Sequence, residues 1–207
     1  MAAGAATAFR AGDVFLEVGD PVSSIYFLVS GAASATMPME NGTAVEVLLF
    51  GRDRAIGLFA ANGPVNTFCR IAAESDGTAI VVPIDRFRAL VDERPTLRAA
   101  VNAHLVAMVT QIAKGAACNA VHRLQPRLAS WLLRFHDRME GRELTLTQEH
   151  MSRMLGVSRT SMNAVAQALQ ATGLVRYTRG RVDIIDRKGL ERVACGCYRA
   201  RGWLEPN

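Results

Sequence analysis

The chain has 207 residues, half of them hydrophobic, which is enough for one large domain or two modest ones. Its apolar stretches are short and broken by charge, and it begins with no basic segment followed by an apolar run. We therefore expect no membrane span and no secretory signal, and a cytoplasmic protein. Residues 1–118 carry 9 Lys and Arg against 11 Asp and Glu, whereas residues 119–207 carry 15 against 8. This division favours a polyanionic partner for the second part.

The first region, residues 1–93, has the pattern of a small antiparallel β-barrel. Short runs rich in β-branched and aliphatic residues, such as 25–29, 45–49 and 78–82, alternate with turn signals such as Ser30-Gly31 and Asp76-Gly77. Many short strands at this spacing indicate a barrel or sandwich. We interpret the region as a sensor domain in a chain of the α+β class.

A long helix is predicted over residues 94–120. Its apolar side chains recur at intervals of four, four, three and four, and so share one face of the helix: Leu97, Val101, Leu105, Met108 and Ile112. A helix of about 20 residues is about 30 Å long and can pair with its copy as in a coiled coil. We expect this stripe to form a homodimer interface. Packing of the helix on its own barrel is the alternative.

The remaining region, 121–207, contains two short helices joined by a tight turn. Thr147 and Ser158 are placed to cap the first and second helix, Gly156 falls in the turn, and Gly173 ends the second helix. Apolar residues occupy the positions at which the two helices would share a core, and the small Ser152 falls where they cross. This spacing is typical of a helix-turn-helix.

The other face of the second helix is polar and carries no acid. Arg can pair with guanine, Asn and Gln with adenine, and Thr can contact the thymine methyl group, so we expect base reading by Arg159, Thr160, Asn163 and Gln167. Around an Arg-Gly-Arg turn, two short alternating runs then predict a hairpin wing. The side chains expected to contact the DNA backbone are Thr147, Gln148, Ser158, Ser161, Arg176, Arg179 and Arg181. An ordinary polar helix face and a solubilising loop are the alternatives.

In this order of elements the chain resembles the Crp/Fnr family of bacterial regulators. The resemblance covers nearly the whole chain and is carried by the residues Leu155-Gly156-Val157-Ser158-Arg159-Thr160-Ser161, Gly173-Leu174-Val175, Gly19-Asp20, Val29-Ser30-Gly31, Leu49-Phe50-Gly51 and the segment 125–133. It implies a cyclic-nucleotide-binding-like, jelly-roll barrel followed by a winged helix-turn-helix. It also implies a homodimer that binds two successive major grooves of a near-palindromic operator in double-stranded DNA. RNA polymerase is a further partner compatible with the resemblance.

The chain departs from this family at two places. Members that bind cyclic AMP carry Gly-Glu and then Arg-Ser/Thr-Ala, whereas this chain reads Gly57-Leu58-Phe59-Ala60-Ala61 with no such triplet after it. We therefore expect no cyclic AMP binding of that kind. The effector is unknown, with Arg70 as a weak candidate contact. In the recognition helix, Thr160 and Ala164 stand where the two best-known branches have Glu and Arg, which predicts a different half-site.

The four cysteines, Cys69, Cys118, Cys195 and Cys197, are scattered, and the histidines fall at no matching intervals. We interpret them as ordinary reduced thiols, with no metal site and no cofactor, and assign Cys195 and Cys197 no role. Residues from 190 to 207 are expected to form one more helix that carries this pair. Oxygen-sensing family members have an N-terminal cysteine cluster, which this chain lacks.

Two rival functions remain. One is a nucleotide- or small-molecule-sensing module that acts through protein contact and binds DNA only without sequence preference. The other is an enzyme of the metal-dependent cupin type, which generally needs several histidines on facing strands, yet no histidine precedes His104. We expect no enzymatic activity.

Overall fold

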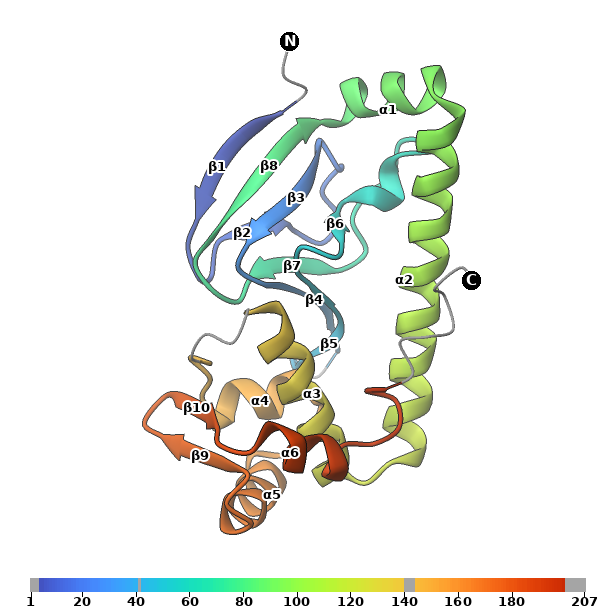
Figure 1. Ribbon diagram of the computed structural model, residues 1–207. Helices are drawn as coiled ribbons and strands as arrows, with labels where there is room; N and C mark the ends of the chain where they lie inside the picture. The colour runs from blue at the N-terminus through green and yellow to red at the C-terminus, as the bar shows by residue number, and fades with distance from the viewer. Residues whose placement is uncertain (1–3, 41, 140–143, 200–207) are drawn as a thin grey trace. The chain divides into compact units, whose positions relative to one another are not determined.

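The computed structural model describes residues 4–40, 42–139 and 144–199, which fold into two compact units (Figure 1). The first unit comprises Met1–Pro38 and Val47–Gln111, and the second Met39–Glu46 and Ile112–Asn207. Within the described residues, no helix combines the length and the apolar character that crossing a membrane requires.

Two antiparallel four-stranded sheets make up the β-structure of the first part of the chain (Figure 1). In order across the first sheet, the strands are β1 (Ala5–Phe9), β8 (Gly77–Pro83), β3 (Ser24–Ser30) and β6 (Ala55–Ile56). In the second sheet they are β2 (Val14–Leu16), β7 (Arg70–Ala73), β4 (Ala33–Pro38) and β5 (Ala44–Phe50). The three runs singled out in the sequence are β3, β5 and β8, and the predicted jelly-roll-like barrel is confirmed.

The register of the sheet follows the apolar alternation of its strands. Ile25 pairs with Val82 and Leu28 with Ala79, and all four side chains are buried. The turn between β3 and β4 contains Gly31 at φ 80°, where a Cβ would come within 2.7 Å of the Asp76 carbonyl oxygen. Only glycine fits this turn without strain.

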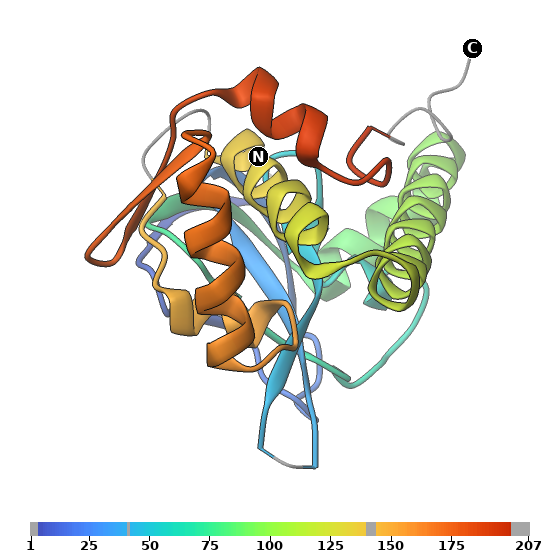
Figure 2. The same ribbon diagram turned by 90° about the horizontal axis from the view of Figure 1, so that it is seen from below.

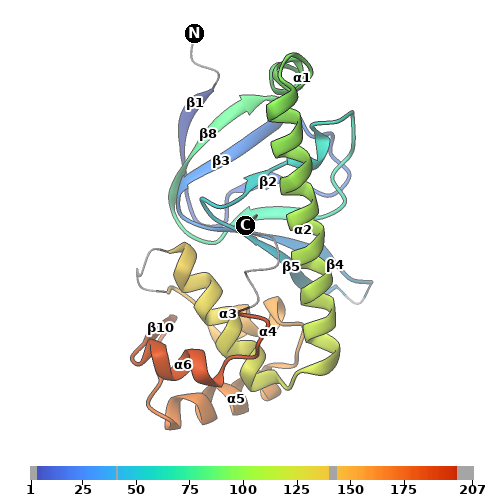
Figure 3. The ribbon, with the colours of Figure 1, turned by 45° about the vertical axis from the view of Figure 1, so that its right-hand side comes forward.

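Two helices follow the barrel, α1 (Ile84–Glu93) and α2 (Pro95–Val121). A short 3-10 turn, η1 (Leu58–Ala60), lies earlier in the chain, between β6 and β7. Figure 3 shows α2 as one continuous helix. It begins at a proline, which suits the first helical position, and it closely matches the predicted bounds of 94–120.

The predicted apolar stripe of α2 does not face solvent. Val101 and Met108 are buried, and Leu97, Leu105 and Ile112 are half-buried. Leu97 and Val101 line a cavity together with Phe27 of β3 and Phe87 of α1. Val101 and Met108 thus pack within the chain, as the alternative had it. The homodimer interface expected of this stripe stays a prediction, and Leu97, Leu105 and Ile112 keep part of their surface exposed.

The second unit contains the remaining helices and a hairpin. The elements are α3 (Leu124–Arg138), α4 (Gln148–Met154), α5 (Arg159–Ala171), β9 (Val175–Thr178), β10 (Arg181–Ile184) and α6 (Arg187–Val193). The core side of α3 is formed by Leu128, Trp131, Leu132 and Phe135, all buried.

The last helix is shorter than predicted and begins earlier. Asp186 caps α6 by accepting a hydrogen bond from the Gly189 amide at 2.9 Å, and the helix ends at Val193 because Ala194 is extended. Cys195 and Cys197 therefore lie in the turn after α6. The expectation that they belong to a helix is wrong, and residues 200–207 of that prediction lie outside the described part of the chain.

Candidate DNA-binding surface

The helices α4 and α5 form the predicted helix-turn-helix, and both predicted caps are confirmed. Thr147 Oγ1 accepts a hydrogen bond from the His150 amide at 3.0 Å, and Ser158 Oγ accepts one from the Ser161 amide at 3.1 Å. Gly156, between the helices, has φ 64°. Each cap satisfies an amide that would otherwise lack a partner at a helix start.

Small and apolar side chains hold the two helices together. The buried members of this shared core are Met151, Ser152, Met154, Leu155, Met162, Ala166 and Leu169. Where the two helices cross, the buried Ser152 hydroxyl donates to the Glu149 carbonyl at 2.8 Å, so its hydrogen-bonding capacity as a donor is satisfied within the protein. Arg127 of α3 donates to the Leu155 carbonyl at 2.9 Å and anchors the end of α4. Nothing in the local sequence around Arg127 indicates this role, because the contact spans 28 residues.

The outer face of α5 holds the four candidate base-reading side chains, Arg159, Thr160, Asn163 and Gln167, and all of them are exposed. Thr160, Asn163 and Gln167 are spaced by three and four residues and so share one side of the helix. No acid occurs in α5. The face is therefore free to approach a polyanion, although base reading itself stays a prediction.

One acid on α4 does reach the start of this face. Glu149 forms an ion pair with the Arg159 guanidinium, and the two side chains are 51% and 74% exposed. The sequence placed Glu149 only in the first turn of α4, where it suits the helix dipole. The pair means that the guanidinium of Arg159 already has a carboxylate partner in the absence of DNA.

The wing is a two-stranded hairpin that projects from the helices of the second unit (Figure 2). Thr178 pairs with Arg181, so the connecting turn is Arg179-Gly180, with Gly180 at φ 75°. Gln170 of α5 accepts a hydrogen bond from the Tyr177 amide at 2.7 Å and so fixes the hairpin to the recognition helix.

The wing arginines differ in their surroundings. Arg176 and Arg179 are exposed, whereas Arg181 is half-buried and donates from Nε to Asp183 at 2.7 Å.

The wing also contains a buried hydroxyl. Burial raises the pKa of Tyr177, whose hydroxyl has no hydrogen-bond partner among the described residues.

The other candidate contacts to the DNA backbone lie at the N-termini of α4 and α5. Thr147, Ser158 and Ser161 are exposed and Gln148 is half-buried. The Ser158 hydroxyl donates to Ser161 Oγ at 2.9 Å while its oxygen caps α5. Helix N-termini with exposed hydroxyls suit phosphate oxygens, although this assignment also stays a prediction.

A polar network fastens the C-terminal segment to α3. Arg187 donates to Asp137 at 2.6 Å and to the Tyr198 hydroxyl at 2.7 Å, and its other nitrogen lies 2.9 Å from His136 Nδ1. Burial and the neighbouring Arg187 lower the pKa of His136, while Asp137 acts in the opposite direction. The network fixes where the chain runs after α6.

The first unit holds a cavity of about 280 Å³. Four of its lining side chains are charged or titratable, namely Arg52, Asp53, Arg54 and His104. The others are apolar: Phe27, Ala55, Leu58, Phe87, Leu97, Ala100 and Val101. Burial lowers the pKa of His104, and Arg54 lowers it further. Arg70 is not in this lining; it is exposed on β7 and forms an ion pair with Glu17 at 3.2 Å.

Two protein-family models match the chain. The cyclic nucleotide-binding domain matches residues 6–94, and the Crp-like helix-turn-helix domain matches residues 126–193. The second match contains α4, α5 and the wing. No curated protein matches the sequence.

Solved structures share this architecture over nearly its whole length. A transcriptional regulator of the CRP/FNR family from Thermus thermophilus is 24% identical, with a TM-score of 0.77 over 96% of this chain and 100% of that chain. FixK2 from Bradyrhizobium japonicum is 14% identical, with a TM-score of 0.78 over 93% and 98%. The c-di-GMP responsive global regulator CLP from Xanthomonas campestris is 18% identical, with a TM-score of 0.72 over 88% and 94%.

The structural likeness establishes the fold, and the two domain models give the order of domains. A cyclic-nucleotide-binding-type barrel, a long helix and a Crp-like helix-turn-helix occur here in one chain. The chain belongs to the Crp/Fnr family of transcriptional regulators.

Proposed function

We propose that the protein is a homodimeric regulator that reads a near-palindromic operator by placing α5 of each copy in the major groove. The observation that carries the proposal is the exposed, acid-free face of α5 with Arg159, Thr160, Asn163 and Gln167, on a helix whose end is hydrogen-bonded to the wing through Gln170. Their donors and acceptors match the edges of guanine and adenine and the methyl group of thymine.

Phosphate contacts supply the rest of the binding energy in this proposal. The exposed hydroxyls at the starts of α4 and α5 and the exposed Arg176 and Arg179 of the wing flank the face of α5 along the chain. Each cation that neutralises a phosphate releases counterions, so affinity falls steeply as salt rises. These contacts set the register of α5 on the duplex, and the side chains of α5 read the sequence.

The dimer interface belongs to a second face of α2. Val106 and Val109 are 57% and 67% exposed. Val106 belongs to a run of small residues spaced alternately by four and three, all exposed except the half-buried Thr110: Ala99, Ala103, Val106, Thr110, Ala113, Ala117 and Ala120.

This spacing is the heptad pattern of a two-stranded coiled coil. The buried Val101 and Met108 lie on the opposite side of the helix from this run, so one face packs within the chain and the other is left for a second copy. Small side chains allow two helices to approach closely. Two-fold pairing through α2 then matches a near-palindromic operator with half-sites one helical turn apart.

The barrel serves as a sensor that does not take cyclic AMP in this proposal. Leu58, which stands where cyclic-AMP-binding relatives carry Glu, is buried and lines the cavity. Arg70 is paired with Glu17 on the surface instead of lining the cavity. Calorimetric titration with cyclic AMP should give no binding at millimolar ligand, and micromolar binding would overturn this part.

The test of the main proposal is selection of bound fragments from random-sequence DNA by the full-length protein without added ligand. Recovery of a palindrome with half-sites about 10 base pairs apart, centre to centre, is the expected result. Recovery of a single half-site would contradict the dimer. Binding without any motif would favour the rival function, a sensing module with protein-contact output.

A further inference from the structure

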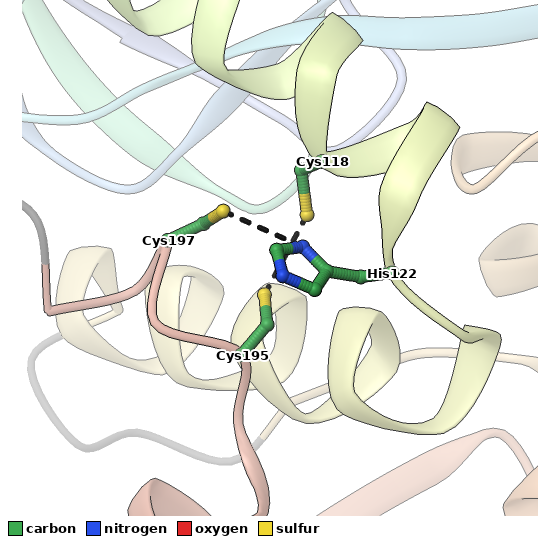
Figure 4. A group of neighbouring side chains, drawn as sticks. All are labelled: Cys118, His122, Cys195 and Cys197. Atoms are coloured by element: carbon green, nitrogen blue, oxygen red, sulfur yellow. Dashed lines mark hydrogen bonds between the residues drawn. The ribbon is translucent and has the colours of Figure 1, made fainter.

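Three cysteines and one histidine from distant parts of the sequence meet in the second unit (Figure 4). The four are Cys118 and His122 from the end of α2, and Cys195 and Cys197 from the turn after α6, and their ligand atoms all lie within 4.8 Å of one another. The Sγ atoms of Cys118 and Cys195 are 3.5 Å apart, and Cys197 Sγ lies 3.6 Å from His122 Nδ1. Four potential ligands thus point to one centre.

Local backbone structure presents each pair of ligands. Cys118 and His122 are one helical turn apart, and the His122 amide still donates to the Cys118 carbonyl at 3.0 Å, so both side chains lie on one side of the helix end. The Cys195-x-Cys197 pair sits in a tight turn in which the Tyr198 amide donates to the Cys195 carbonyl at 3.0 Å.

Contacts around the cluster hold the turn in place. The Cys195 amide donates to the Pro126 carbonyl at 3.2 Å, and Ser130 Oγ lies 3.0 Å from Cys195 Sγ. The Tyr198 hydroxyl accepts from Arg187, which also binds Asp137. The turn is therefore tied to α3 at both ends. The Ser130 hydroxyl also donates to the Pro126 carbonyl at 2.9 Å, and once Cys195 is a thiolate it could donate to the sulfur instead, as outer-shell groups do around metal ligands.

The geometry and the chemistry of this set suit zinc. In tetrahedral sites the Zn–S bond is about 2.3 Å and the Zn–N bond about 2.0–2.1 Å, so neighbouring ligand atoms stand about 3.5–3.8 Å apart. The two separations given above match that range. Three thiolates and one imidazole form a closed ligand set of the structural type. Cys118 and Cys195 are buried, and Cys197 and His122 are half-buried, so the centre is shielded from bulk solvent.

We propose that Cys118, His122, Cys195 and Cys197 bind one zinc ion, which clamps the end of α2 to the segment that follows α6. The ion would join the end of the helix proposed for dimerisation to the domain that contains α5. This site replaces the sequence-based expectation of unconnected thiols and no metal. It is independent of the DNA proposal, since a chain that binds no DNA can still bind zinc.

The test is metal binding by the full-length protein. The protein purified under reducing conditions should contain one zinc per chain, and after chelation it should take up one Co²⁺ with the visible absorption of tetrahedral thiolate coordination. Cys195→Ser and His122→Ala should abolish stoichiometric zinc. Cys69→Ser, which removes a buried cysteine of the barrel, is the matched control and should retain it.

Two further variants keep the proposal falsifiable if a ligand variant fails to fold. His122→Cys retains four ligands and should bind Co²⁺ with an added thiolate charge-transfer contribution. Ser130→Ala should lower zinc affinity about 10–100-fold with one site retained. The proposal is overturned if the three cluster thiols titrate freely in protein saturated with Zn²⁺, or if the protein shows an iron–sulfur chromophore. A Cys118–Cys195 disulfide in the reduced preparation, or loss of zinc in Cys69→Ser, would also overturn it.

Discussion

Glu149 in the first turn of α4 forms an ion pair with Arg159, the first residue of α5. The helix-turn-helix thus carries a carboxylate against the first of its candidate base-reading side chains. Because both side chains are largely exposed, the pair contributes little to stability, on the order of 0–1 kcal/mol. Its expected consequence lies in DNA binding, since in the proposed complex the carboxylate would compete with DNA for the guanidinium.

Replacement of Glu149 by Gln should raise affinity for random-sequence DNA several-fold and reduce the preference for the selected operator. The substitution removes a negative charge that lies near the expected phosphates and frees Arg159 from its partner. Fluorescence anisotropy with operator and scrambled duplexes at matched salt measures both effects. Lower affinity for both duplexes would show instead that Glu149 holds Arg159 in its binding position.

Replacement of Arg179 by Ala should weaken binding to all sequences about equally and lower the slope of log affinity against log salt by about 1. Arg179 is exposed in the turn of the wing, where phosphates are the expected partners. Arg192→Ala removes an equally charged, exposed side chain from α6 and should leave the slope unchanged. A sequence-dependent loss for Arg179→Ala would assign it to base reading.

Replacement of Val106 by Glu should convert the dimer to a monomer and abolish tight operator binding. The charge would lie in the seam of small residues on α2, where desolvation without a partner is costly. Asn119→Glu adds the same charge to an exposed position of α2 outside the seam and should leave the dimer intact. Light scattering with size-exclusion chromatography distinguishes the two, and a dimeric Val106→Glu variant would rule out this face.

Replacement of Tyr177 by Phe should leave stability unchanged or raise it by about 1 kcal/mol. The hydroxyl is buried and has no hydrogen-bond partner among the described residues, so its removal relieves a desolvation cost and opens only a small cavity. Urea denaturation gives the free energy of unfolding. A loss of more than about 1 kcal/mol would reveal a partner for the hydroxyl.

Local signals in the sequence were sufficient for the elements and caps of the helix-turn-helix. Thr147, Ser158 and Gly156 act within a few residues of their own positions, so spacing and side-chain chemistry alone predicted them. The strands of the barrel were found for the same reason. Contacts between distant residues, such as Arg127 with the Leu155 carbonyl, leave no such local pattern.

The face of α2 shows how periodicity can mislead. The large apolar residues form the more obvious stripe, but Val101 and Met108 are buried within the chain. The run from Ala99 to Ala120 is weakly hydrophobic, so its sequence looks like that of an ordinary solvated face, although its residues are small and mostly exposed in the structure. Sequence periodicity identifies an apolar face without telling which partner covers it.

The cysteine–histidine cluster was missed for a different reason. Cys118 and Cys195 are 77 residues apart, and neither Cys118-x3-His122 nor Cys195-x-Cys197 alone is a familiar zinc motif. A cysteine and a histidine one helical turn apart were the available signal. The fold had to bring the two halves together before the set of four could be recognised.

The most direct test of base reading by α5 is selection from random-sequence DNA with Arg159→Ala beside the wild-type protein and Arg192→Ala. If Arg159 reads a base, Arg159→Ala should lose preference at one base pair in each half-site, symmetrically, with specific binding weaker by about 1–3 kcal/mol. Arg192→Ala should recover the wild-type motif. An unchanged motif with Arg159→Ala, or an equal loss of affinity on every sequence, would contradict base reading by Arg159.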